Sequence, residues 1–100
     1  MELPIVELQT ERIDYRIILT LVGAKSRVLD MGCGDGELLY LLNKNLETRS
    51  QGIEIDHEQI MQCVERGINV LLGDLDSGLT DFKDNSFDYV ILNNALQELR

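Results

Sequence analysis

Apolar residues recur at helical spacing in the first quarter of the chain and predict a helix over residues 11–22. Gly23 follows at a place suited to a helix end. A short apolar run over residues 27–31 predicts a strand, and a leucine-rich run over residues 37–42 predicts a second helix that ends within residues 43–45. Only a cluster of glycines separates the two elements, so the strand leads directly into the helix.

The pattern then repeats, with a strand predicted over residues 51–55 and a helix over residues 57–66. Asp56 stands at the N-cap position of this helix, and Gln59 follows three residues later, which is the spacing of a capping box. Gly67 stands where a glycine commonly ends a helix. Both ends of the predicted helix are therefore marked by the sequence.

Two more apolar runs, over residues 68–72 and 87–92, predict a third and a fourth strand. We expect residues 73–86 to form a compact loop and residues 94–100 to begin a helix. Strands that alternate with helices build a parallel sheet through right-handed crossovers, with ligands at the carboxyl ends of the strands. The predicted fold class is α/β: a Rossmann-like parallel sheet of about four strands with flanking helices.

Such a sheet has little cover on one of its faces, whereas buried parallel strands need cover on both. We therefore expect residues 1–100 to be a single, partial domain, in which residues 1–24 form an N-terminal helical segment. An exposed apolar edge beside the fourth strand would invite pairing. This predicts either a homodimer or a shortened chain.

The composition, with 44% hydrophobic and 27% charged residues, is that of an ordinary globular chain. No apolar run is long enough for a membrane span, and the N-terminus lacks the features of a signal peptide, so a cytoplasmic location is expected. The net charge is −9 and is concentrated in residues 51–100, which hold ten acids and three bases. A nucleic-acid partner is not expected, because phosphate binding depends on clustered Lys and Arg.

The two cysteines, Cys33 and Cys63, have no metal-binding or disulfide-framework spacing, so reduced thiols and no metal site are expected. Cys33 lies inside the glycine cluster. No basic residue close in sequence would lower the pKa of its thiol, so we interpret it as a small residue chosen for fit rather than as a nucleophile.

The glycine cluster places Gly32, Gly34 and Gly36 directly after the first strand. Glycine is needed where the backbone turns tightly and a ligand must approach without a Cβ in the way. The simpler alternative is a plain strand-to-helix turn, but a turn seldom needs three glycines. The cluster therefore predicts a cofactor loop.

The acidic residues of this loop favour a cationic cofactor. In the dinucleotide fingerprint G-x-G-x-x-G the third glycine would stand where this chain has Glu37. Asp30 and Asp35 add negative charge that would repel a pyrophosphate. S-adenosylmethionine carries an α-ammonium and a sulfonium and no phosphate, so it suits the loop, and a nicotinamide oxidoreductase is disfavoured.

Two further acids follow the second and third strands. Glu54 lies 18 residues after Gly36, close to the spacing at which an acid accepts hydrogen bonds from ribose hydroxyls. Asp74 and Leu75 follow the third strand, where a carboxylate and a backbone N–H could meet adenine. A solvated strand-end acid and a turn-forming Asp are the alternatives. Three signals at the ends of three consecutive strands favour the cofactor site.

The sequence resembles the class I methyltransferases and, more narrowly, the family of the methionine biosynthesis protein MetW. The broader resemblance rests on the motifs at residues 28–36, 52–56, 73–76 and 87–92. The narrower one rests on residues 34–39, 52–56, 67–70, 73–76 and 96–97, and it covers roughly residues 11–100. Members of the family continue into further strands, so the chain corresponds to the N-terminal, cofactor-binding half of their fold.

This resemblance implies that S-adenosylmethionine is the cofactor, with Asp30 near the methionine ammonium, Glu54 on the ribose and Asp74–Leu75 at the adenine. The full candidate set also contains the loop residues along the methionine moiety and the residues that follow two strands: Gly32, Cys33, Gly34, Gly36, Ile55 and Asn93. Asn93, with Asn94 and Gln97, also lies where a methyl acceptor would approach, although strand-end and cap roles explain these residues equally well.

The resemblance implies a methyltransferase of a small molecule or a protein partner in methionine biosynthesis. The alternative is a non-catalytic, cofactor-binding regulatory partner of homoserine O-acyltransferase, the enzyme to which MetW-like proteins are linked. An anion held tightly against the sulfonium would favour the ground state. The acids are therefore assigned to binding, and no residue is assigned to catalysis.

Overall fold

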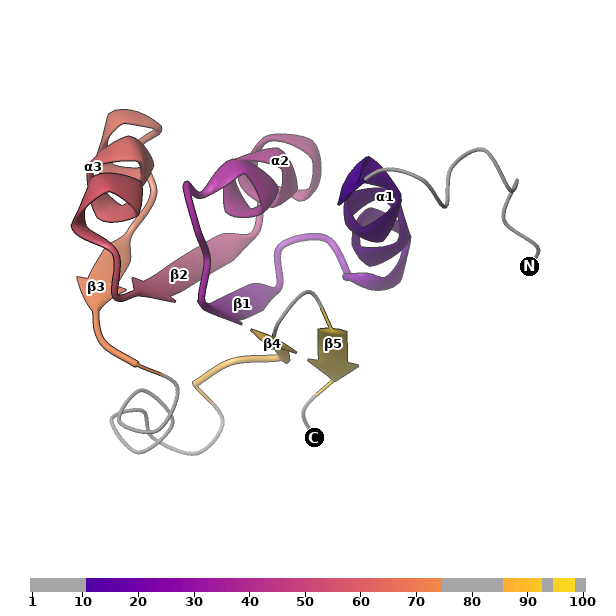
Figure 1. Ribbon diagram of the computed structural model, residues 1–100. Coiled ribbons are helices and arrows are strands. Elements are labelled where there is room, and N and C mark those ends of the chain that lie inside the picture. Colours follow the sequence, from indigo (N-terminus) through magenta and orange to yellow (C-terminus); the bar gives the residue numbers. More distant parts are fainter. Residues whose placement is uncertain (1–10, 75–85, 93–94, 99–100) are drawn as a thin grey trace.

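The computed structural model describes residues 11–74, 86–92 and 95–98, in which helices alternate with strands of one sheet (Figure 1). The α/β fold class is thus confirmed. The elements in chain order are α1 (Glu11–Leu21), β1 (Arg27–Met31), α2 (Glu37–Leu46), β2 (Arg49–Glu54), α3 (His57–Glu65), β3 (Val70–Leu72), β4 (Tyr89–Leu92) and β5 (Ala95–Glu98).

The predicted bounds agree with the structure for the first helix and differ at the C-terminal end of the second. α1 has the expected bounds to within one residue. α2 runs past the asparagines that were expected to end it and stops at Leu46. Its end is set by Glu47, which adopts a left-handed φ of 54° and donates its N–H to the carbonyl of Asn43. A single residue in this conformation satisfies a carbonyl at the end of a helix.

The end signals of α3 are confirmed. The side chain of Asp56 accepts hydrogen bonds from the N–H groups of Glu58 and Gln59 at the N-terminus. Gly67 follows the C-terminus with a φ of +75°, the left-handed conformation that favours glycine. The capping is one-sided, because the N–H of Asp56 donates to Glu54 rather than to Gln59.

The sheet has the strand order β3-β2-β1-β4-β5. β1 lies between β2 and β4 and is parallel to both, so that Asp30 is in register with Gly52 on one side and Ile91 on the other. The chain builds outward from β1 to β3 and then crosses to the other side of β1. A reversal of this kind opens a crevice at the carboxyl ends of the strands, which is where α/β sheets bind ligands.

The prediction of a helix over residues 94–100 is wrong. Ala95–Glu98 is a fifth strand, antiparallel to β4, with Leu92 opposite Ala95 and Tyr89 opposite Glu98. A strand at the edge of a sheet leaves a row of N–H and C=O groups unpaired, and a short return of the chain satisfies them. β4 is consequently paired on both sides, whereas the expected homodimer stays a prediction.

Both faces of the central strands are buried. α1, α2 and α3 lie on one face (Figure 1), where Val28, Leu39 and Leu42 are fully buried. On the opposite face, Leu29 and Met31 form a second apolar cluster together with residues of β2 and β4. β1 is thus apolar in consecutive residues, which is the pattern of a strand buried on both sides. Asp30 is the exception in this strand.

Gly52 of β2 lies so close to the glycine-rich loop that a Cβ there would stand 2.6 Å from the Sγ atom of Cys33. We expect Gly52→Ala to lower the free energy of unfolding by about 2 kcal/mol, because the overlap forces the loop away from the strand. Urea unfolding monitored by circular dichroism measures the loss. The control is Gly52→Ala in a Cys33→Ala background, where most of the loss should be recovered. An equal loss in both backgrounds would contradict this origin.

Candidate cofactor-binding site

The glycine-rich loop, residues 32–36, joins β1 to α2 and depends on a left-handed backbone. Gly32, Gly34 and Gly36 have φ angles of +82°, +60° and +84°, which L side chains rarely adopt. Among the described residues, a Cβ at Gly32 or Gly34 would meet nothing within 4 Å. The space over these two glycines is therefore open to a ligand.

Backbone hydrogen bonds hold this loop against the end of β2. The N–H groups of Gly32 and Cys33 both donate to the carbonyl of Ile53, at 2.7 and 3.0 Å. The N–H of Gly34 donates to Oε1 of Glu54 at 2.8 Å. The ends of β1 and β2 are thus brought together, as the spacing of their motifs predicted.

Glu54 uses most of its carboxylate within the protein. Besides Gly34 at Oε1, it accepts the N–H groups of Ile55 and Asp56 at Oε2, at 3.1 and 3.0 Å. A carboxylate has about four lone-pair positions, so roughly one remains, on Oε1. The side chain is fixed in orientation and still offers an acceptor at the edge of the loop.

Asp30 is a buried acid one residue before the end of β1, with only 5% of its surface exposed. Burial raises its pKa to about 7, and the charge of Glu54 acts in the same direction. An acid in this setting is costly to ionise alone. A cation placed beside it would favour the ionised form, so Asp30 and Glu54 together suit a positively charged group.

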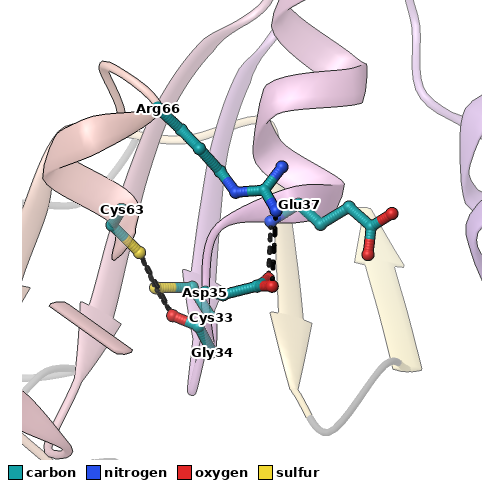
Figure 2. Close-up of polar contacts among 6 residues, drawn as sticks. All are labelled: Cys33, Gly34, Asp35, Glu37, Cys63 and Arg66. Carbon is teal, nitrogen blue, oxygen red and sulfur yellow. Dashed lines mark hydrogen bonds and ion pairs between the residues drawn. The ribbon is translucent and has the colours of Figure 1, made fainter. Parts of the chain in front are cut away.

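Both carboxylate oxygens of Asp35 contact other residues of the protein. Asp35 therefore contributes less to the attraction of a cationic cofactor than the sequence suggested. Its Oδ1 accepts the N–H of Glu37 at 3.0 Å, at the start of α2. Its Oδ2 lies 3.5 Å from a guanidinium nitrogen of Arg66, which follows α3 (Figure 2). Arg66 thus offsets part of the charge of Asp35, whereas within the described part of the chain no ion pair engages Asp30 or Glu54.

The other candidates differ in how far the structure places them. Ile55 follows Glu54 and is 65% exposed. Asp74 follows β3 and is exposed, and the neighbouring Gly73 N–H donates to the carbonyl of Glu54, which ties the end of β3 to the site. Leu75 and Asn93 lie outside the described residues.

Both thiols are free and buried. Burial, with the nearby Cys63, raises the pKa of the Cys33 thiol well above its usual range, which is unfavourable for a nucleophile. No group of three or more His, Cys, Asp or Glu side chains that could hold a metal ion occurs in the described part of the chain. In the same part, no helix has the length and apolarity to cross a membrane.

Two loop contacts were not foreseen from the sequence. Cys63 and Arg66 reach the loop from α3 and the residue that caps it, about 30 residues further along the chain. No motif marks them, because their role depends on how α3 packs against the loop.

The sheet order, the glycine-rich loop after β1 and the acid at the end of β2 define a Rossmann-like, class I methyltransferase fold. Solved structures agree. An S-adenosylmethionine-dependent methyltransferase from Archaeoglobus fulgidus is 31% identical, with a TM-score of 0.69 over 87% of this chain and 36% of its own. A TehB-like S-adenosylmethionine-dependent methyltransferase from Corynebacterium glutamicum is 22% identical, with a TM-score of 0.61 over 78% of this chain and 42% of its own.

Residues 12–100 match the family model described as methionine biosynthesis protein MetW. The chain belongs to this family. The bifunctional methionine biosynthesis protein MetXA/MetW of Rhodopirellula baltica is 41% identical over 96 residues, which are 88% of this chain and 15% of that protein. The chain thus spans a small part of this curated relative and less than half of the solved structures.

The raised pKa of Asp30 predicts how the stability of the fold depends on pH. Between pH 4 and 7 the unfolded chain releases the Asp30 proton, whereas the folded chain, with a pKa of about 7, retains it. Stability therefore falls as the pH rises through this range and is level above it. We expect Asp30→Asn to be more stable than the wild type at pH 8, by up to about 4 kcal/mol, and the difference to shrink by pH 5. Urea unfolding at the two pH values measures it.

Asp88→Asn is the matched control. Hydrogen bonds from Arg27 lower the pKa of this exposed carboxyl, so its loss should not stabilise the protein at either pH. A gain for Asp30→Asn that is the same at pH 5 and pH 8 would contradict the assignment to a buried, titrating acid.

Proposed function

We propose that this chain binds S-adenosylmethionine at the carboxyl edge of β1 and β2, as the cofactor-binding part of a methyltransferase in methionine biosynthesis. Two observations carry the proposal: a buried acid, Asp30, interacts electrostatically with Glu54, and Glu54 contacts a loop in which a Cβ at Gly32 or Gly34 would meet nothing within 4 Å among the described residues. Asp30 takes the α-ammonium, and the loop around Cys33 lines the methionine moiety. Glu54 and Ile55 meet the ribose and the adenine edge, with Asp74, Leu75 and Asn93 completing the set.

The free acceptor position on Glu54 limits how the ribose binds. One ribose hydroxyl can donate to Oε1 alongside the N–H of Gly34. A second hydroxyl has to displace a backbone N–H from Oε2, which holds those of Ile55 and Asp56. Ile55, exposed next to this carboxylate, offers apolar surface to a base.

The same loop is poorly equipped for a pyrophosphate. Phosphates bind at helix N-termini through free backbone N–H groups. Of the six N–H groups from Gly32 to Glu37, five donate to acceptors within the protein, namely those of Gly32, Cys33, Gly34, Gly36 and Glu37. A dinucleotide would find few donors and two acids, which supports the cationic cofactor.

A partner follows from the relative that joins the names MetXA and MetW in one chain. We take homoserine O-acyltransferase as the partner of this protein and a small molecule as the methyl acceptor. When bound, the cofactor supplies an electrophilic methyl group on its sulfonium. The contribution of the described residues is to bind and align it, since alignment alone can supply much of the acceleration in such a displacement.

Calorimetric titration of the protein with S-adenosylmethionine, and separately with NAD, tests the proposal. Tighter binding of S-adenosylmethionine is expected, and Glu54→Gln should weaken it strongly. A glutamine places an N–H₂ group against backbone N–H donors that a carboxylate accepts, so it loses acceptors and adds repulsion. Tighter binding of NAD than of S-adenosylmethionine would contradict the proposal.

The affinity for S-adenosylmethionine should also depend on pH. Asp30, with a pKa of about 7 in the free protein, must lose its proton to pair with the ammonium. We expect the affinity to fall about tenfold from pH 8 to pH 6, with proton release on binding at pH 6. Titrations in two buffers of different ionisation enthalpy measure both. Asp30→Asn should bind weakly without this pH dependence, and a variant that retains it would rule out Asp30 as the source.

A further inference from the structure

α3 and the residue that caps it contact the glycine-rich loop at Gly34 and Asp35. Figure 2 shows Cys63 reaching from α3 toward Gly34, and Arg66 extending from the end of this helix to Asp35. The Sγ atom of Cys63 donates to the carbonyl of Gly34 at 3.1 Å. These contacts involve the loop backbone itself rather than only neighbouring side chains.

The peptide groups on either side of Gly34 are therefore held by two different elements. The N–H of Gly34 donates to Glu54 at the end of β2, and its carbonyl accepts from Cys63 in α3. Cys63 has one thiol hydrogen. The one hydrogen of Cys33 then goes either to the Cys63 sulfur or to the Gly34 carbonyl, each at 3.7 Å, and the first arrangement gives a short chain from Cys33 through Cys63 to Gly34. Hydrogen bonds in such a chain strengthen one another.

Close packing accompanies these bonds. Cys63 is fully buried, and a Cβ on Gly36 would stand 3.0 Å from its Sγ atom. Arg66 adds an ion pair to Asp35, whose other oxygen accepts the first N–H of α2. The loop is thus held by contacts with α3 on one hand and with the first residue of α2 on the other.

A glycine-rich loop needs such contacts more than other loops do. Glycine loses more conformational freedom on ordering than any other residue, and three glycines here take left-handed φ angles. A loop that samples other conformations binds its ligand more weakly, in proportion to the fraction of time that it spends in the competent one. Contacts that favour one loop conformation therefore raise affinity without touching the ligand.

We infer that Cys63 and Arg66 are positioning residues for the cofactor loop: the thiol of Cys63 orients the Gly34 carbonyl, and Arg66 holds Asp35 at the start of α2. The inference rests on the proposed function only in taking this loop as the cofactor loop. Cys63 has the larger effect because it is buried. Arg66 and Asp35 are each more than a third exposed, and exposed ion pairs are weak.

The first test compares Cys63→Ala with Cys63→Ser by titration with S-adenosylmethionine. Cys63→Ala should weaken binding by about three- to tenfold, the effect of one hydrogen bond, whereas Cys63→Ser retains a donor and should recover most of the affinity. Arg66→Ala should weaken binding by about threefold at low salt and have no effect at about 0.5 M salt. Val90→Ala, buried in the opposite cluster, controls for a general loss of stability and should bind like the wild type.

The second test needs no ligand. Amide hydrogen exchange at Gly34 to Gly36 should be about fivefold faster in Cys63→Ala than in the wild type, and close to the wild-type rate in Cys63→Ser. If the wild type does not bind S-adenosylmethionine, the proposed function fails while exchange still decides the role of Cys63. Equal exchange in all three proteins, or a Ser variant that behaves like the Ala variant, would overturn the inference.

Discussion

The carboxylate of Glu54 joins the two parts of the molecule on which the site depends. It accepts one N–H from the glycine-rich loop and two from the residues that begin the turn into α3. Its position is possible because β1 and β2 are parallel and in register, with Met31 opposite Ile53, so that both strands end at the same edge. A carboxylate is the side-chain group able to accept several N–H bonds at once, and here it fixes the loop while leaving an acceptor for a ligand.

Under the proposed function, stability and binding favour different residues at position 30, where the chain has Asp30. β1 is buried on both faces, and an apolar residue at this position would be cheaper to fold. The acid is retained next to a second acid, where burial and repulsion favour its neutral form. Ionising Asp30 is unfavourable in the absence of a ligand. A bound cation would make it favourable, because it supplies a positive charge that the site itself lacks. The same arrangement disfavours phosphate-bearing cofactors.

Much of the fold could be predicted because its signals are local. The apolar run of β1, the N-cap at Asp56 and the glycine after α3 depend on residues close together in the chain, and the structure has them as expected. The end of α2 and the nature of Ala95–Glu98 were misjudged. In the first case a non-glycine residue took the left-handed conformation. In the second, pairing with β4 decided the state of a segment whose local preference pointed to a helix.

The sequence alone determined the kind of site: three glycines after a strand, acids at the ends of β1 and β2, and a spacing that brings them to one edge of a parallel sheet. It determined the family as well, because the motifs that carry the resemblance are contiguous. Only the tertiary structure decided which acids of the site are engaged by other residues and which is buried. It showed Asp35 paired with Arg66, Asp30 buried beside Glu54, and Cys63 bonded to the loop. These relations join residues about 20 to 30 positions apart, and the packing of α3 and β2 against the loop sets them, which no local pattern encodes.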